Sequence, residues 1–286
     1  MADLTTSPAG IWVLQALLGV ETMPVTLGLR PYIPSVDSGP TVLTVAGERP
    51  LTQTAEYASL VEAGVIATDG RVDDAVRDWM TVVGRPDREV VVAIRRPAPD
   101  AGDTILIQER TLSVCRRGRW LAMIARNGDE IVLAPVGETA SPDEQVALIA
   151  DTVMHAFGDS APAAIDGVNL PTASLRKATD AARDGDRWAV ATALARLGLS
   201  PDQVAAVVAG LRLDESAMAV VSVVDHGVAR TVHPEVLGVY DTDHGRFSLT
   251  NTTAPDRSGW TSIWPATPAA LRQDLIRLLS VPQAAG

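Results

Sequence analysis

The hydrophobic residues of this chain recur at intervals of three and four in several stretches, and three of these stretches follow a Ser-Pro or Thr-Pro pair. A hydroxyl residue that caps the helix, followed by proline at the first helical position, is a common start of an α-helix. The pairs begin at Ser141, Ser200 and Thr267, and Gln203 stands where a capping box has its second residue. The pattern predicts helices that begin at residues 142, 201 and 268.

The same period predicts four further helices. The stretch 72–83 has its apolar residues on one stripe and its acidic residues on the other side. Two more stretches lie at 172–184 and 187–197, and the second is followed by Gly198, a residue type common just after a helix. Together with the helix after Ser200 they predict a small helical bundle. The run Ile11–Val20 predicts an amphipathic or buried helix.

Eight stretches rich in β-branched and aromatic residues fill the intervals between the helices and predict strands. They lie at residues 89–94, 111–115, 119–125, 130–136, 217–224, 236–240, 246–250 and 260–264. Several of them are apolar at consecutive positions, which indicates that both faces of the sheet are at least partly covered. Between two of the strands, Asn127 and Gly128 predict a type I′ hairpin turn, because both residue types tolerate a positive φ.

The order of these elements repeats along the chain with an offset of about 130 residues. Each half has a helix, a meander of four strands and a helix capped by Ser-Pro or Thr-Pro. The fold class predicted is α+β, in which two pseudo-symmetric meanders form one central antiparallel sheet flanked by helical bundles. We expect one domain, 1–286, made of halves at about 1–157 and 158–286.

The amino-acid composition argues against several classes of function. The chain has 47% hydrophobic and 21% charged residues, as in globular proteins, and a formal charge of -11. This acidity argues against a nucleic-acid binder or a binder of anionic membranes. Cys115 is the single cysteine, so an intrachain disulfide is excluded and a cytoplasmic location fits. The apolar run Ile11–Val20 is too short to span a bilayer, so no membrane insertion is expected.

The richest polar cluster lies in "VYDTDHGRFSLTN", residues 239–251, and contains Asp241, Asp243 and His244. A calcium loop is excluded, because its glycine and its bidentate glutamate would stand at other positions. Three zinc ligands this close in a hairpin could not all reach one ion without help from elsewhere. We therefore predict a hairpin tip. The alternative is a small-molecule-binding or hydrolytic enzyme whose polar site includes these residues.

Other signals of catalysis are weak. The chain has no G-x-S-x-G nucleophile elbow and no glycine-rich phosphate loop. Cys115 precedes two arginines that could lower its pKa, but its apolar strand favours a buried structural thiol. We predict no catalytic residue, no metal and no cofactor.

Two further features concern the surface. The segment 95–126 has seven arginines against three acidic residues, which fits either a solvated hairpin edge or a docking surface for an acidic partner. Trp79 and Trp188 are predicted to be core residues. Trp260 and Trp264 alternate onto one strand face and could reach a surface groove.

Five segments, in order and spacing, carry a resemblance to a known family. They read "WVLQALLGVETMPVTLGLRPY", "LVEAGVIATDGRVDDAVRDWMTVVGRPDREVVVAI", "RNGDEIVLAPV", "VYDTDHGR" and "WTSIWPATPAALRQDLIRLL". The chain resembles the EspG family of ESX (type VII) secretion-associated proteins of mycobacteria over nearly its whole length. The segment "LGLRPYIP" looks most like members that serve the third ESX system.

This resemblance implies a cytosolic chaperone and not an enzyme. Members of the family recognise PE-PPE heterodimers, bind the exposed apolar tip of the PPE helical bundle and keep the substrate soluble until secretion. An open sheet edge would also allow the free protein to form a homodimer.

The resemblance also places the contacts with the partner on the central sheet, the C-terminal bundle and the loop after the first meander strand. That loop is 96–104, and its Pro, Gly and Asp content predicts an exposed, mobile segment. By position, the expected partner-binding residues are Arg96, Ala98, Pro99, Asp100, Asp103, Asn169, Thr172, Arg183, Ser222 and Val224.

Overall fold

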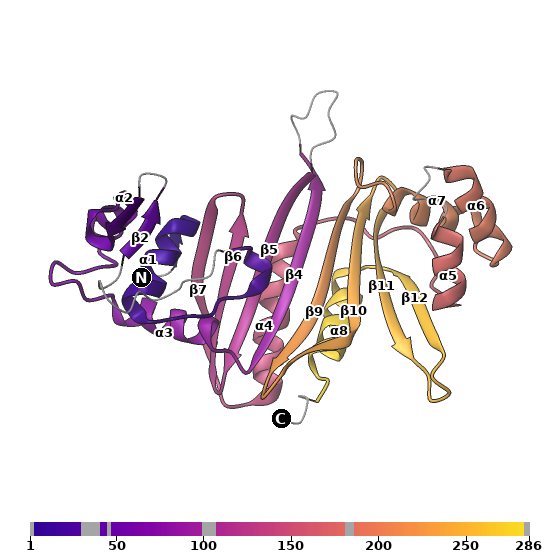
Figure 1. Cartoon of the computed structure of the whole chain (residues 1–286). Coiled ribbons are helices and arrows are strands. Elements are labelled where there is room, and N and C mark those ends of the chain that lie inside the picture. Colours follow the sequence, from indigo (N-terminus) through magenta and orange to yellow (C-terminus); the bar gives the residue numbers. More distant parts are fainter. Residues whose placement is uncertain (1–2, 30–40, 45–46, 99–106, 181–185, 283–286) are drawn as a thin grey trace.

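A ten-stranded antiparallel sheet runs through the whole molecule (Figure 1). The computed structural model describes residues 3–29, 41–44, 47–98, 107–180 and 186–282. The strand order is β1-β7-β6-β5-β4-β9-β10-β11-β12-β8, and helices pack on both faces. The α+β class and the single central sheet that the sequence predicts are therefore confirmed.

Two four-stranded meanders make up most of the sheet, and all eight predicted strands are present. They are β4 (Arg88–Pro97), β5 (Ile107–Arg117), β6 (Trp120–Asn127) and β7 (Glu130–Glu138) in the first, and β9 (Ala217–His226), β10 (Arg230–Thr242), β11 (Gly245–Thr253) and β12 (Gly259–Pro265) in the second. The meanders join through β4 and β9, which pair from Arg88 opposite Asp225 to Arg95 opposite Met218.

Short strands that the sequence does not predict form the two ends of the sheet. β1 (Leu4–Thr6) pairs with β7, and β8 (Val168–Pro171) pairs with β12. Strands of three and four residues are too short to show an alternating pattern. A separate hairpin consists of β2 (Thr41–Thr44) and β3 (Gly47–Pro50). Since each half begins with an edge strand and ends with a helix, we propose one domain with halves at about 1–157 and 158–286.

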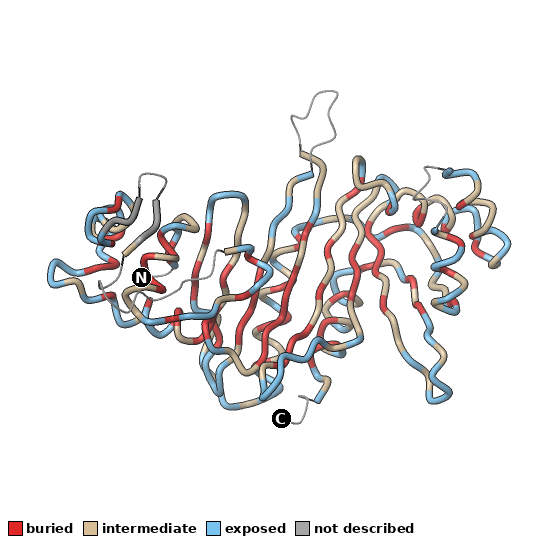
Figure 2. Tube along the Cα trace, in the orientation of Figure 1, coloured by how far each residue is buried: buried red, intermediate tan, exposed pale blue. Residues whose placement is uncertain are grey.

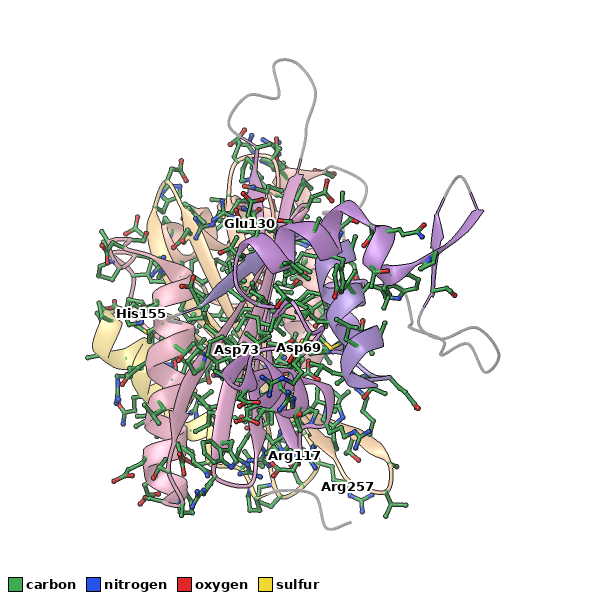
Figure 3. All side chains as sticks on the ribbon, turned by 90° about the vertical axis from the view of Figure 1, so that its left-hand side faces the viewer. Asp69, Asp73, Arg117, Glu130, His155 and Arg257 are labelled. Carbon is green, nitrogen blue, oxygen red and sulfur yellow. The ribbon has the colours of Figure 1, made fainter. Side chains whose placement is uncertain are left out.

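The two faces of the sheet carry different helices. On the face we call face A, Val90 and Val92 of β4 and Val221 of β9 pack against α4 (Pro142–Phe157) and α8 (Pro268–Leu279). These two helices lie side by side behind the central strands in Figure 1. Figure 3 shows the sheet from its N-terminal end, with α4 and α8 on one side and α1 on the other.

The opposite face, face B, carries two separate groups of helices. The first meander is covered by α1 (Pro8–Leu18), η1 (Val25–Leu27), η2 (Leu51–Gln53), α2 (Ala55–Glu62) and α3 (Asp74–Gly84). The second is covered by α5 (Thr172–Thr179), α6 (Arg187–Arg196) and α7 (Pro201–Gly210). No helix in the described part of the chain is long and apolar enough to cross a membrane.

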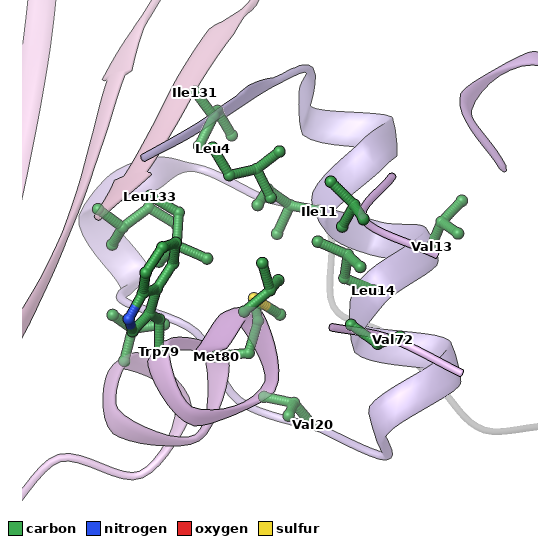
Figure 4. Close-up of a cluster of buried hydrophobic side chains, with 14 of the residues drawn as sticks. Leu4, Ile11, Val13, Leu14, Val20, Val72, Trp79, Met80, Ile131 and Leu133 are labelled. Atoms are coloured by element: carbon green, nitrogen blue, oxygen red, sulfur yellow. The ribbon is translucent and has the colours of Figure 1, made fainter. Parts of the chain in front are cut away.

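Each group of helices closes its own core. In the first, Trp79 and Met80 of α3 pack with Ile11 of α1 against Ile131 and Leu133 of β7 (Figure 4). In the second, Leu194 of α6 and Val207 of α7 pack with Phe247 of β11. Figure 2 shows the buried residues concentrated along the central strands and on the inner sides of the helices.

The predicted helix caps are present. The side chains of Ser141, Ser200 and Thr267 accept backbone hydrogen bonds in the first turns of α4, α7 and α8, and Ser200 forms a full capping box with Gln203. Ser7, followed by Pro8, caps α1 in the same way. This fourth pair and α2 are not among the elements predicted from the sequence.

Two local predictions are wrong. The turn between β6 and β7 has Gly128 and Asp129 at its centre, because Asn127 pairs with Glu130. Gly128 has φ 62° while neither neighbour has a positive φ, as in a type II′ turn. The prediction that Trp188 is a core residue is also wrong, because Trp188 is 80% exposed. Val190 and Leu194 form the buried side of α6. Trp188 stands two positions before Val190, so its side chain lies on the opposite side of the helix.

A buried ion pair holds the centre of the sheet to the end of α8. The guanidinium of Arg88 binds the carboxylate of Asp225 at 2.7 and 3.1 Å, and both side chains are less than a tenth exposed. Arg88 also donates to the backbone carbonyls of Leu279 and Val281, at 3.3 and 2.9 Å. This arginine therefore links β4, β9 and the C-terminal end of α8.

Replacing Arg88→Ala should lower the free energy of unfolding by about 3–5 kcal/mol, because Asp225 would keep a buried charge without its main partner. Urea denaturation measures the change. The control is Arg71→Ala, which removes an ion pair with Asp69. The side chain of Arg71 is 79% exposed and that of Asp69 is 56% exposed. It should cost less than about 1 kcal/mol. Equal effects of the two substitutions would contradict the central role of Arg88.

Candidate functional site

The polar cluster near residue 241 is a hairpin, as predicted, and Asp241 has a structural role in it. Asp241 binds Arg246 through both carboxylate oxygens, at 2.5 and 2.8 Å. Arg246 is only 4% exposed and also donates to the carbonyls of Phe157 and Gly158. The pair therefore fixes the C-terminal end of α4 against β10 and β11.

Asp243 and His244 form the tip of the same hairpin. Neither has a positive φ, whereas Gly245 has φ 96°, the pattern of a type I turn followed by a glycine bulge. A Cβ on Gly245 would lie 2.8 Å from the backbone of Ala163, so glycine is required there. The two tip side chains are well exposed, at 81% and 46%.

The three residues do not converge on one site. Asp243 and His244 line a groove of about 510 Å³ beside α6 and α7, while Asp241 faces Phe157 and Val239 on the other side of the sheet. Among the described residues there is no group of three or more His, Cys, Asp or Glu side chains that could hold a metal. Asp241, Asp243 and His244 therefore do not form the polar site that the enzymatic alternative requires.

A second polar cluster is buried on face B. The carboxylate of Glu89, 1% exposed, accepts a hydrogen bond from the Ser113 hydroxyl at 2.8 Å and lies 3.0 Å from Nε2 of His226. In a catalytic triad the histidine lies between the serine and the acid. Here the acid lies between the other two, so the serine hydroxyl has a carboxylate beside it and not the histidine that a triad requires.

Cys115 lies beside this cluster and is fully buried, as the sequence predicted. Burial raises the pKa of its thiol well above the ordinary value, and the nearby carboxylate of Glu89 raises it further. Because the thiolate is the reactive form, this cysteine is a poor nucleophile.

The arginines of segment 95–126 are mostly engaged within the molecule. Arg95, Arg116 and Arg119 form ion pairs with Glu109, Asp87 and Glu138. The side chains of Arg96 and Arg126 donate to backbone carbonyls. Arg117 lies towards the lower end of the sheet in Figure 3. This pairing favours the hairpin-edge interpretation over a basic docking surface.

The middle of face B has no helix of the described residues over it. Figure 1 shows β4, β9 and β10 facing the viewer between the N-terminal helices and α5–α7. Apart from Arg95, the side chains here are small or apolar, and all are at least partly exposed. We call them the open stripe: Ala93, Arg95, Met218, Val220, Ser222 and Val236.

The structure places the predicted contact residues in different surroundings. Ser222 is at the centre of the open stripe, opposite Val91 and Val236. Val224 is on the same face but only 2% exposed. Arg96 uses its guanidinium to bind the carbonyl of Phe157 at 3.1 Å.

The remaining predicted residues are spread further. The hydroxyl of Thr172 lies 2.9 Å from that of Thr261 on face B. Asn169, opposite Ser262, lies on face A, so it and Ser222 are on opposite faces of the sheet. Ala98 is the last described residue of the β4 side of the loop. Pro99, Asp100, Asp103 and Arg183 lie outside the described residues.

Face A has a groove of its own at its C-terminal end. Trp264, Ser262 and Thr250 of the sheet line one side, and Ala270 and Ile276 of α8 lie among the residues of the other. The groove has a volume of about 830 Å³. Trp260 and Trp264 are 39% and 49% exposed, in agreement with the prediction that they share an accessible strand face.

Comparison with known proteins gives relatives along the whole chain. The "ESX-5 secretion-associated protein EspG5" of Mycobacterium tuberculosis is 28% identical over 280 residues, which cover 93% of this chain and 89% of that protein. The "ESX-2 secretion-associated protein EspG2" of the same species is 29% identical over 232 residues, covering 72% and 78%. The "ESX-1 secretion-associated protein EspG1" of Mycobacterium marinum is 26% identical and covers 95% and 86%.

A solved structure agrees in fold over the full length. It is the Mycobacterium tuberculosis type VII secretion system chaperone EspG5 in complex with the PE25-PPE41 dimer, with a TM-score of 0.76 and 25% identity. The match covers 100% of this chain and 98% of that one. The sequence profile described as "EspG family" matches residues 7–276. On the profile, the relatives and the shared fold together, the chain belongs to the EspG family.

Proposed function

We propose that the chain is a chaperone that binds PE-PPE heterodimers and keeps them soluble for secretion by a type VII (ESX) system. The observation that carries the proposal is the full-length similarity to EspG5, a chaperone captured in complex with a PE-PPE dimer. The relatives in the ESX-1, ESX-2 and ESX-5 systems support the same role. Service to the third system stays a prediction from "LGLRPYIP".

The open stripe is the surface we propose for the apolar tip of the PPE helical bundle. A helix can approach a sheet closely where side chains are small, as at Ala93 and Ser222. The stripe is also bounded on both sides by helices, which would supply further contacts. Of the predicted contact residues, Ser222 is therefore the strongest candidate. Thr172 begins α5 in the bundle at one side of the stripe.

The other parts of the proposal have independent support. A non-enzymatic role agrees with the divergent side chains of Asp241, Asp243 and His244 and with the high pKa of the buried Cys115 thiol. A cytoplasmic location agrees with a single cysteine, which excludes an intrachain disulfide.

Replacing Ser222→Tyr should abolish co-purification with a co-expressed cognate PE-PPE pair. A ring at the centre of the open stripe would occupy the space of the partner helix, while the partly exposed site should accept it in the free protein. The control is Ser262→Tyr, the same change on face A. Both variants should keep the melting temperature within a few degrees. Normal binding by Ser222→Tyr, with loss in Ser262→Tyr, would place the partner on face A.

The double substitution Asp243→Asn and His244→Asn should leave partner binding unchanged. It should change the free energy of unfolding by less than about 0.5 kcal/mol, since both side chains are exposed. Asp241→Asn should cost about 1–3 kcal/mol, because Arg246 would lose its charged partner in a buried position. Urea denaturation and co-purification measure the two effects. Loss of binding in the double variant at unchanged stability would assign the hairpin tip a functional role.

A further inference from the structure

A pocket of about 390 Å³ opens on face B at the lower end of the two central strands in Figure 1, where β4 begins and β9 ends. It lies where η1, the end of α3 and the hairpin between β9 and β10 meet. Its apolar walls come from Met23, Pro24, Val25, Val83 and Pro86. A pocket with apolar walls and a few polar groups is the usual form of a binding site.

The floor of this pocket is polar and internally satisfied. Glu89 and His226 line it, and the carboxylate of Glu89 is held by the Ser113 hydroxyl at 2.8 Å and by Nε2 of His226 at 3.0 Å. The His226 side chain is 28% exposed and that of Glu89 only 1%. The imidazole is therefore the more accessible group, and the buried carboxylate already has its partners.

The walls are fixed by backbone contacts between distant segments. The hydroxyl of Thr22 donates to the carbonyl of Gly84, and the amide of His226 donates to the carbonyl of Asp87 at 2.9 Å. A Cβ on Gly84 would lie 2.3 Å from the side chain of Val20, so the segment before η1 packs directly on the end of α3. The pocket is therefore a built feature of the fold.

Two arginines give the rim a positive charge. Arg85 and Arg230 both line the pocket and are exposed, and neither has an ion pair with any other described residue. The pocket therefore brings two arginines without an ion pair together at one rim, in a chain whose net charge is -11. Charges of like sign at a rim favour a partner of the opposite sign.

Apolar side chains beside the pocket are unusually exposed. Val25 is 70% exposed, Val228 in the hairpin turn 97%, and Val232 on β10 54%. Val232 pairs with Val224, so it is on face B with the pocket. Exposed apolar residues rimmed by charge are typical of surfaces that bind other proteins.

We propose that this pocket docks an acidic segment of a second partner polypeptide, which inserts one apolar side chain between η1 and α3 and pairs its carboxylates with Arg85 and Arg230. The charge of the rim selects the acidic partner, and the apolar walls select the inserted side chain. The site goes beyond the proposed PE-PPE binding and does not depend on it.

Fluorescence anisotropy with a fluorescein-labelled peptide, Asp-Glu-Leu-Asp-Glu, tests the proposal on the full chain. The peptide should bind with a Kd below about 1 mM. Two probe controls are the peptide with Ala in place of Leu and the peptide with Lys at all four acidic positions. Both should bind at least about tenfold more weakly. The affinity for the acidic peptide should fall as salt increases.

The decisive variant is Arg85→Glu with Arg230→Glu, which should bind the acidic peptide at least about tenfold more weakly than the unaltered chain. Its matched control is Arg176→Glu with Arg196→Glu, the same change in charge at exposed positions of α5 and α6, which should bind within about twofold. Equal circular dichroism melting curves for both variants show that folding is unaffected.

Three results would overturn the proposal. The acidic peptide could fail to bind at 1 mM, it could bind the two double variants equally, or the basic peptide could bind as tightly as the acidic one. A fourth result would show that the pocket binds a different partner. If sedimentation showed a dimer of the unaltered chain that Arg85→Glu with Arg230→Glu dissociates, the pocket would bind a second copy of this chain.

Discussion

The pairing of β4 with β9 is the constraint on which the rest of the molecule depends. Without it each half would be a separate meander with an exposed central edge, and exposed edges favour aggregation. The pairing closes both edges and brings α4 and α8 together on face A. Arg88 and Asp225 lie at one end of this junction, where their ion pair also holds the end of α8.

The same pairing accounts for the surface left for binding. Because the helices at the start of each half cover the outer strands of face B, the central strands stay without a helix between them. On face A the helices at the end of each half meet over the centre. The middle of face A is therefore covered by α4 and α8, while the middle of face B is exposed. Face B thus offers a broad binding surface that the helices of face A support from behind.

Much of this arrangement is legible in the sequence. Ser-Pro and Thr-Pro pairs predict where α4, α7 and α8 begin. Stretches rich in β-branched residues predict all eight strands of the two meanders. Other features depend on contacts between distant segments. The edge strands β1 and β8 are defined only by their pairing with β7 and β12. The face on which a residue lies also depends on that pairing, which is why Asn169 and Ser222 cannot be recognised from sequence as lying on opposite faces. Trp188 shows that a large apolar residue does not by itself indicate the core.

The central claim is that a PE-PPE partner binds the open stripe of face B. It is tested most directly by a photo-crosslinker, p-benzoylphenylalanine, placed at Arg95 on face B or at Gln273 on α8, both exposed positions. After co-expression with a cognate PE-PPE pair and irradiation, the account predicts a covalent adduct to PPE from position 95 and none from position 273. An adduct from position 273 alone would contradict it and place the partner on face A.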